Sequence, residues 1–242
     1  MADNLTPQWE LVRRCPVCGS SRIEELLTQT GVYRLAELKT VYFQCKQCLV
    51  EFQNPRMHNM DDFYGKGFYR RMLGQSPARV SEEGVRRAAT IIKFLQKRLS
   101  SVRSFLDFGS ATGDLLDAVA RTYGATVQGI EIDEKLAAYA NAKGRNTTSY
   151  LCWEGYDLIA IVHTLEHLIW PTFRLQDLRE RMVNGGYIYI EVPKGTYVDA
   201  HVISFSIGSL KHCAELAGFE VLETIEHNGD LILWGRCWHV PF

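Results

Sequence analysis

The segment Asp107-Phe108-Gly109-Ser110-Ala111-Thr112-Gly113 decides the fold, because it joins a short apolar strand to the start of a helix. Gly109 and Gly113 have no Cβ, so the backbone can turn sharply there and lie close to a ligand. The N–H groups at the start of the next helix point toward the same ligand. The loop therefore predicts a site for a nucleoside-containing cofactor at the tip of the first strand of an α/β sheet.

Expected strands and helices alternate on both sides of this loop. The strands cover residues 104–108, 126–130, 156–162 and 187–192, and the helices cover 114–123, 133–144, 171–184 and 209–217. Such alternation predicts parallel strands joined by right-handed crossovers. The last two expected strands, 221–226 and 231–238, flank the tight-hairpin dipeptide Asn228-Gly229. We therefore expect the final strand to run antiparallel to its neighbour.

Another helix is expected to begin near Ser81, before the first strand. Its apolar residues recur at helical spacing and predict one buried stripe, formed by Val85, Ala88, Ala89, Ile92, Leu95 and Leu99. The opposite face carries basic residues, namely Arg86, Arg87, Lys93, Lys97 and Arg98. A solvated helix face is the expected role of these charges, and a nucleic-acid surface is the alternative.

The composition excludes several classes of protein. Of the 242 residues, 46% are hydrophobic and 23% are charged, which is typical of globular proteins. The net charge of −1 gives no sign of a polyanionic partner, so nucleic-acid binding is not expected. No apolar run approaches the ~20 residues of a membrane span, and Met1–Glu10 is too polar for a signal peptide. We therefore expect a cytoplasmic protein without a membrane partner.

Two Cys-x-x-Cys pairs stand near the N-terminus, at Cys15/Cys18 and Cys45/Cys48. Each pair can place two thiolates on one tetrahedral metal, and four sulfur ligands with no open position fit structural Zn²⁺. The chain has seven cysteines, an odd number, and we expect no export signal. Both observations favour reduced thiols over disulfides. The expected organisation is a zinc-binding module over 1–56, an aromatic connector over 57–80 and a cofactor-binding domain over 81–242.

An acidic residue stands on each side of the expected crevice. Glu131 follows the second strand, where a carboxylate can accept hydrogen bonds from both ribose hydroxyls. Asp107 opens the glycine loop, which lacks the Gly-x-Gly-x-x-Gly pattern of a dinucleotide site. An acid there can hold an ammonium group, which S-adenosylmethionine carries where NAD carries pyrophosphate. The expected cofactor-binding residues are Asp107, Gly109, Ser110, Ala111, Gly113, Glu131, Ile132 and His163.

Residues 105–221 resemble the class I S-adenosylmethionine-dependent methyltransferases. The resemblance rests on Asp107, Gly109, Gly113 and Glu131, with Ala111 at a position where the family often has glycine. It implies a Rossmann-like seven-stranded sheet of order 3-2-1-4-5-7-6 with the last strand antiparallel. The stretch from Asn146 to Gly155 shows no clear equivalent of the acidic residue that meets the adenine amine in many members.

Three further segments resemble one large subgroup with an N-terminal zinc-binding region: the paired knuckles with Asn54-Pro55-Arg56 and Phe63-Tyr64, the segment His163–Leu168, and Asn184–Ile188. Members of this subgroup often methylate sugars, frequently nucleotide-linked ones, in polysaccharide or natural-product pathways. The resemblance thus implies a small-molecule acceptor that contains a sugar. Subgroup members that methylate carbon carry an extra C-terminal domain, so a hydroxyl or amine is the expected acceptor atom.

Histidines near the carboxyl ends of the strands are the candidate catalytic residues, since open α/β sheets bind ligands there. His163 ends the fourth strand, while Tyr197 and His201 lie in the long loop after Pro193. Our hypothesis is that His201 is the general base, that His163 shapes the floor of the methyl-transfer site, and that Tyr197 lies beside the substrate. The alternatives are an RNA methyltransferase with a zinc module and a non-catalytic zinc-ribbon interaction protein.

Overall fold

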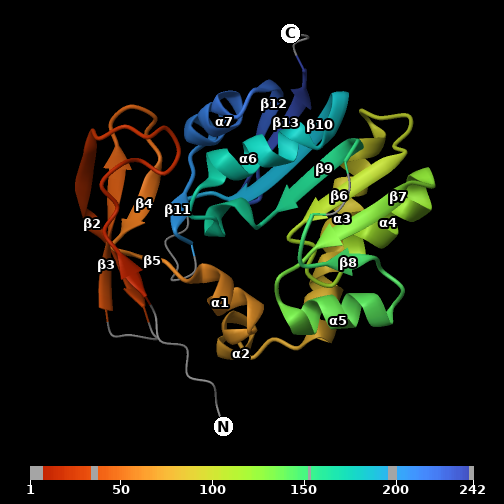
Figure 1. The fold of residues 1–242 in the computed structure, drawn as a ribbon, viewed down its shortest axis with the longest axis horizontal. Coiled ribbons are helices and arrows are strands. Elements are labelled where there is room, and N and C mark those ends of the chain that lie inside the picture. Colours follow the sequence, from red (N-terminus) through yellow and green to blue (C-terminus); the bar gives the residue numbers. More distant parts are fainter. Residues whose placement is uncertain (1–7, 34–37, 152–153, 196–200, 240–242) are drawn as a thin grey trace.

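The computed structural model describes residues 8–33, 38–151, 154–195 and 201–239. Its main element is a seven-stranded sheet, with β8 (Thr147–Thr148), β7 (Thr126–Ile130), β6 (Ser104–Phe108), β9 (Tyr156–Val162), β10 (Met182–Pro193), β13 (Asp230–Cys237) and β12 (Phe219–His227) in that order (Figure 1). β13 runs antiparallel to both of its neighbours, and the pairings from β8 to β10 are parallel. The predicted α/β fold and strand order are therefore confirmed.

The turn between β12 and β13 has the backbone that the sequence predicts. Asn228 and Gly229 have φ angles of 50° and 86°, in the region that a tight two-residue hairpin requires. His227 pairs with Asp230 across this turn. The hairpin reverses the chain and makes β13 the antiparallel member of the sheet.

The helices agree with the predicted ones at most of their ends. They are α3 (Pro77–Gln96), α4 (Asp114–Tyr123), α5 (Glu134–Ala142), α6 (Pro171–Glu180) and α7 (Ile207–Leu216), with a short 3₁₀ turn η1 (Leu165–His167) after β9. Asp133 caps α5 as expected, because its carboxylate accepts hydrogen bonds from the N–H groups of Lys135 and Leu136. Within the described residues, every helix is too short or too polar to cross a membrane.

The predicted end of the helix that starts at Pro171 is wrong. α6 stops at Glu180, and β10 already begins at Met182. Gly185 and Gly186 belong to an irregular stretch of β10 instead of ending the helix. A Cβ on Gly186 would lie 3.0 Å from the carbonyl oxygen of Val183, so close backbone packing explains the glycine.

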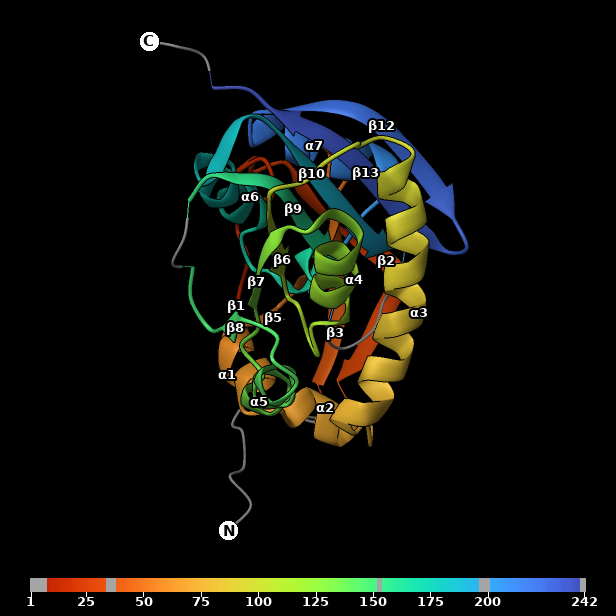
Figure 2. The same cartoon turned by 90° about the vertical axis from the view of Figure 1, so that its right-hand side faces the viewer.

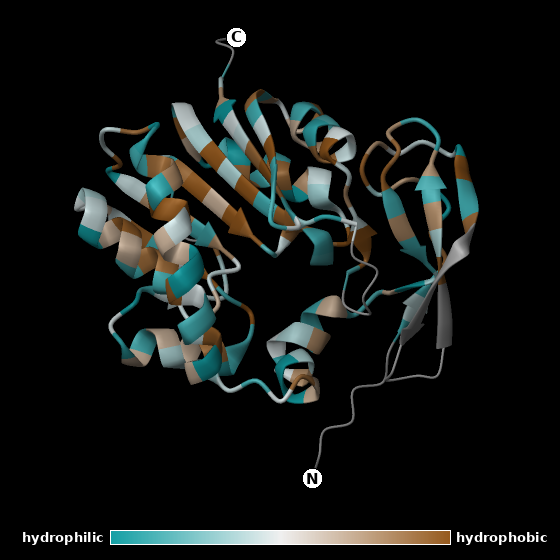
Figure 3. Cartoon of the chain, turned by 180° about the vertical axis from the view of Figure 1, so that it is seen from behind, coloured by the Kyte–Doolittle hydropathy of each residue, from teal (hydrophilic) through white to brown (hydrophobic). Residues whose placement is uncertain are grey.

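Two apolar cores lie on the two faces of the large sheet. α3 and α4 cover one face, where Ile91, Leu95 and Leu116 pack against side chains such as Phe105 (Figure 2). α6 and α7 cover the other face. Successive side chains of a strand point to opposite faces, and each central strand is buried on both faces, which explains its continuous apolar sequence (Figure 3).

The predicted apolar stripe of α3 is partly wrong. Val85 is 56% exposed and Ala89 is also exposed, whereas Val80, Ala88, Ile91 and Leu95 are buried. The reason lies at Gly84, where a Cβ would stand 2.6 Å from the carboxylate of Asp114. This close approach turns the face of α3 that carries Gly84 and Ala88 toward α4, and Val85 faces outward.

The N-terminal region forms a second, four-stranded sheet with an unexpected member. Its antiparallel strands are β2 (Ile23–Tyr33), β3 (Leu38–Cys45), β4 (Glu51–Asn54) and β11 (Ile203–Ser204). β11 comes from the long segment after β10, so a strand from the second half of the chain completes the N-terminal sheet (Figure 1). A separate pair joins β1 (Trp9–Glu10) to β5 (Arg56–Met57).

The connector consists of two short helices, α1 (Met60–Gly65) and α2 (Phe68–Met72). The core beneath them is continuous with the core under α6 and α7. Thr172 donates a hydrogen bond to the carbonyl oxygen of Val17 at 2.8 Å, and the buried Arg56 donates to that of Ile169 at 2.8 Å. The N-terminal region is thus packed against the α6–α7 side of the large sheet.

We expect Leu95→Ala to lower the free energy of unfolding by about 2–5 kcal/mol, because it leaves a cavity between α3 and the sheet. The matched variant Val85→Ala should change it by no more than about 0.5 kcal/mol, since Val85 is exposed. Urea unfolding followed by circular dichroism measures both. Equal losses for the two variants would contradict the packing of α3 described above.

Candidate active site

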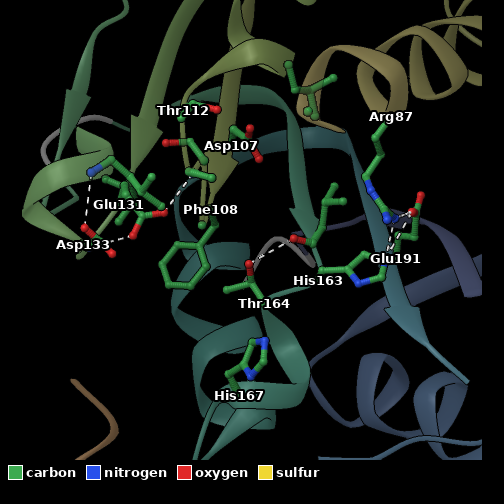
Figure 4. A pocket seen from close by; sticks show the side chains of 18 of the residues that line it. Arg87, Asp107, Phe108, Thr112, Glu131, Asp133, His163, Thr164, His167 and Glu191 are labelled. Atoms are coloured by element: carbon green, nitrogen blue, oxygen red, sulfur yellow. Dashed lines mark hydrogen bonds and ion pairs between the residues drawn. The ribbon is translucent and has the colours of Figure 1, made fainter. Parts of the chain in front are cut away.

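A cavity of about 1320 Å³ opens at the carboxyl ends of β6, β7 and β9 (Figure 4). Seven of the eight residues predicted to bind the cofactor line it: Asp107, Gly109, Ser110, Ala111, Glu131, Ile132 and His163. The eighth, Gly113, is the N-cap of α4, with a left-handed backbone (φ 74°). The strand tips therefore bring these residues together around one space, as the carboxyl edge of a parallel sheet does in related architectures.

The glycine loop has the sharply turned backbone that its sequence predicts. Gly109 has φ 86°, and a Cβ there would lie 2.0 Å from the hydroxyl of Thr164. Ala111, where the family often has glycine, also has a positive φ of 46°. The N–H groups of Gly109 and Ser110 both donate to the carbonyl oxygen of Ile130, at 2.8 and 2.9 Å. The loop is thereby folded back over the tip of β7.

Glu131 holds the loop against β7 with both carboxylate oxygens. One oxygen accepts a hydrogen bond from the N–H of Ala111 at 2.8 Å, and the other accepts from the N–H of Asp133 at 2.7 Å (Figure 4). Burial is the main reason that the pKa of Glu131 is raised. The loop and the Glu131 carboxylate therefore lie on the same side of the sheet and face the same cavity.

Asp107 is a buried carboxyl near the end of β6, with one oxygen left unsatisfied by the described part of the chain. It is 4% exposed, and its Oδ1 atom has no hydrogen-bond partner among the described residues. Burial, with smaller contributions from the charges of Glu131 and Asp114, raises the pKa of Asp107 to about 7. A buried carboxyl that lacks a countercharge is complementary to a cationic ligand.

A second group of polar side chains surrounds Glu166, which is 2% exposed. Its Oε1 lies 3.5 Å from His167 Nε2 and 4.0 Å from both His163 Nδ1 and His201 Nε2. Neither carboxylate oxygen has a hydrogen-bond partner in the described part of the chain. Burial raises the pKa of Glu166 to about 7, against the lowering effect of His163. Glu166 is thus a buried acid that three histidines surround.

The histidines of this group come from separate segments. His163 follows β9 directly and has a positive φ of 48°, His167 is the last residue of η1, and His201 precedes β11. The rings of His167 and His201 meet edge to face, with centroids 4.9 Å apart. Tyr64 of α1 lies 2.7 Å from His167 Nδ1 through its hydroxyl. The structure therefore brings His163 and His201 to one cavity, whereas Tyr197 lies outside the described residues.

A third group ties α3 to the large sheet. Arg87 forms an ion pair with Glu191 of β10 and lies 3.4 Å from Asp230 of β13 (Figure 4). His163 Nε2 lies 3.2 Å from Asp230 Oδ1. Burial alone would lower the pKa of His163, but the hydrogen bond to Glu191 and nearby carboxylates raise it overall. Arg87 therefore lines the cavity, and its side chain is still 41% exposed, as expected for a member of the solvated basic face.

Several cavity residues have only weak signals in the sequence. Glu166 stands in the segment His163–Leu168, but a buried acid cannot be told from an exposed one in so short a polar stretch. Glu191 and Asp230 lie on strands, and Arg87 lies on a helix that also carries exposed charges. Their meeting depends on how α3 crosses the sheet, and no local pattern encodes that crossing.

The two Cys-x-x-Cys pairs converge at one point in the N-terminal region. The Sγ atoms of Cys15 and Cys48 are 3.5 Å apart, as are those of Cys18 and Cys45, and all four lie within 4.8 Å of one another. Sulfurs bound tetrahedrally at about 2.3 Å from a metal stand roughly 3.7 Å apart. Backbone N–H groups also point at the sulfurs, as in the 3.4 Å contact from Gln47 to Cys45. Four thiols at this spacing can hold one metal ion.

The sequence over residues 80–224 matches a family model described as a methyltransferase domain. The match covers more than half of the chain and includes the glycine loop, Glu131 and the segment around Glu166. It begins after the cysteine pairs and the connector. No curated protein sequence matches the chain.

Solved methyltransferases share the fold. A SAM-dependent methyltransferase from Aquifex aeolicus has a TM-score of 0.55 at 18% identity, over 67% of this chain and 99% of that chain. Magnesium protoporphyrin IX methyltransferase from Synechocystis, with bound SAM, scores 0.53 at 18% identity, over 74% and 94%. The N-methyltransferase NodS from Bradyrhizobium japonicum, in complex with S-adenosyl-L-homocysteine, scores 0.52 at 14% identity, over 63% and 86%.

Identities this low show the fold alone, and the match to the family model supplies the family. The glycine loop and the two strand-tip acids of the cavity lie within the residues that the family model covers. The chain belongs to the methyltransferase domain family, as an enzyme with the fold of the S-adenosylmethionine-dependent methyltransferases.

Proposed function

We propose that this enzyme transfers a methyl group from S-adenosylmethionine to a hydroxyl or amine of a small molecule that contains a sugar, such as a nucleotide-linked sugar of polysaccharide or natural-product biosynthesis. The observation that carries the proposal is the pair of acids at the strand tips, of which Asp107 is buried and Glu131 is partly buried. Asp107 would hold the ammonium group and Glu131 the ribose hydroxyls, with Gly109 and Ser110 against the cofactor and Ile132 offering an apolar surface. When bound, the sulfonium supplies the electrophilic methyl group.

His201 is our proposed general base. His201 lines the cavity, and its imidazole would accept the proton of the acceptor, while the Glu166 carboxylate, 4.0 Å from Nε2, would stabilise the resulting imidazolium. His163, held by Glu191 and Asp230, would shape the floor beneath the methyl group. Tyr197 keeps its proposed place beside the acceptor. Much of the rate would come from holding the two reactants in line.

The basic face of α3 lends little support to an RNA acceptor. Arg87 is paired with Glu191, and Arg98 is paired with Glu223 at 2.5 Å, so these cations already have acidic partners. The net charge of −1 also lacks the excess of basic residues that is typical of nucleic-acid-binding proteins. A small polar acceptor agrees better with the cavity, which histidines and carboxylates line together.

We further propose that Cys15, Cys18, Cys45 and Cys48 bind one structural Zn²⁺. The four sulfurs leave no position for a substrate, which is typical of structural sites. Such a site needs reduced thiols, and the described cysteines form no disulfides, which supports a cytoplasmic location.

The affinity for S-adenosylmethionine should fall as the pH drops through 7. Below the raised pKa of Asp107, about 7, the carboxyl is protonated and cannot pair with the ammonium group, so Kd should rise up to about tenfold per pH unit. Calorimetry between pH 5.5 and 8.5, about 1.5 units on either side, measures this. Asp107→Asn should weaken binding and flatten the dependence, and the control Asp157→Asn, at the far end of the strands, should retain it. A flat wild-type profile would remove Asp107 from the site.

His201→Ala should lower turnover at least about 100-fold, the loss expected for a general base, while Kd for S-adenosylmethionine stays unchanged. The acceptor is first found by incubating the enzyme with labelled S-adenosylmethionine and a panel of nucleotide-linked sugars, with label transfer as the readout. His58→Ala is the control, because that side chain is 59% exposed and lies in the N-terminal region. Undiminished turnover in His201→Ala would show that another group takes the proton.

Metal analysis of the purified protein should find about one Zn²⁺ per chain, since the binding free energy of a structural site is large. The double variant Cys15→Ser/Cys45→Ser should lose it, because one thiolate of each pair is gone. Cys213→Ser, which changes a buried thiol outside the cluster, should keep it. Zinc retained in the double variant would contradict the proposed ligands.

A further inference from the structure

We propose that the N-terminal sheet is a working part of the active site, and that Tyr42 is the residue through which it positions His201. The inference deepens the proposed function, because it assigns a support to the proposed base. It rests on contacts between β3 and β4 and the segment that carries His201.

The segment after His201 is bound to the N-terminal sheet by its backbone. β11 pairs with β4 at Ile203–Phe52 and Ser204–Glu51. One residue earlier, the N–H of Gln53 donates a hydrogen bond to the carbonyl oxygen of Val202 at 3.0 Å. Val202 and Ile203 are almost completely buried. The main chain next to His201 therefore follows the position of β4.

Tyr42 extends this attachment to His201 itself. Its hydroxyl donates a hydrogen bond to the carbonyl oxygen of His201 at 3.1 Å and accepts one from the side-chain amide of Gln53 at 3.0 Å. Tyr42 and Gln53 both have an exposed fraction of 0%. A buried hydroxyl held between these two groups has little freedom to move, so it fixes the His201 carbonyl relative to β3 and β4.

The cysteine cluster connects to the same two strands. β3 ends at Cys45, and β4 begins three residues after Cys48, so the second Cys-x-x-Cys pair forms the turn between them. A metal held there would fix the turn and hence the relative position of Tyr42 and Gln53. The N-terminal region, which lies outside the residues 80–224 that the family model matches, would thus help to position His201.

Catalysis by His201 should be sensitive to small displacements of its side chain. Its Nε2 lies 4.0 Å from Glu166 Oε1, and its ring meets the edge of His167. A displacement of about 1 Å in a reacting group can lower a rate by about 100-fold. The loss of a single hydrogen bond should cause a smaller displacement and therefore a smaller loss of rate. Tyr42 is therefore a positioning residue that acts through the backbone of His201.

The test compares Tyr42→Phe with Tyr123→Phe in the full-length protein. The hydroxyl of Tyr123 is also buried, but it has no hydrogen-bond partner in the part of the chain that the structure describes, which makes it a matched control. In Tyr42→Phe, amide hydrogen exchange over residues 201–205 should accelerate about tenfold, and the nuclear Overhauser contact between the rings of His167 and His201 should weaken. Tyr123→Phe should leave both unchanged. Kd for S-adenosylmethionine should stay the same in both variants, which also shows that they are folded.

These readouts need no acceptor, so they stand apart from the proposed function. With the acceptor in hand, kcat of Tyr42→Phe should fall about tenfold at unchanged KM, and Tyr42→Phe should cause no further loss in the His201→Ala background. An active His201→Ala would remove the proposed base, whereas unchanged exchange in Tyr42→Phe, or additive losses in the double variant, would overturn the positioning role alone. Gln53→Met, which removes the amide beside the hydroxyl, provides a second variant with the same expected direction if Tyr42→Phe fails to fold.

Discussion

The hydrogen bonds of the Glu131 carboxylate to the N–H groups of Ala111 and Asp133 are the interaction on which the cavity depends. They bind the glycine loop to the tip of the neighbouring strand, so that the ends of β6 and β7 form one wall. Two further acids are buried in the same space. One oxygen of Asp107 and both oxygens of Glu166 have no hydrogen-bond partner among the described residues. Burying such groups is unfavourable unless something compensates their charge. The arrangement is therefore suited to a cationic ligand at Asp107 and to protonatable histidines at Glu166.

The parts of the fold that the sequence predicts well are those with local signals. The strand at 104–108, the helix at 114–123 and the hairpin at Asn228-Gly229 each depend on a short run of residues, and the structure confirms them. The glycine loop and Glu131 belong to the same class, because a parallel sheet brings the carboxyl ends of its strands to one edge. The carboxylate that follows the second strand therefore had to meet the loop that follows the first.

The errors arise where packing between distant segments decides the outcome. Gly185 and Gly186 look like a helix end, but both belong to β10, where carbonyl groups of neighbouring segments lie close to Gly186. Val85 has helical spacing with the other apolar residues, yet the contact between Gly84 and Asp114 rotates the helix away from it. The pairing of β11 with β4 lies beyond any local pattern, since about 150 residues separate the two strands.

The position of β11 late in the chain affects how the N-terminal sheet can fold during synthesis. During synthesis β2, β3 and β4 leave the ribosome long before residues 203–204, so one side of β4 has no strand to pair with for most of translation. Unpaired strand edges are templates for wrong association. The newly made N-terminal segment would therefore depend on chaperone protection, or on delayed folding, until the last fifth of the chain emerges.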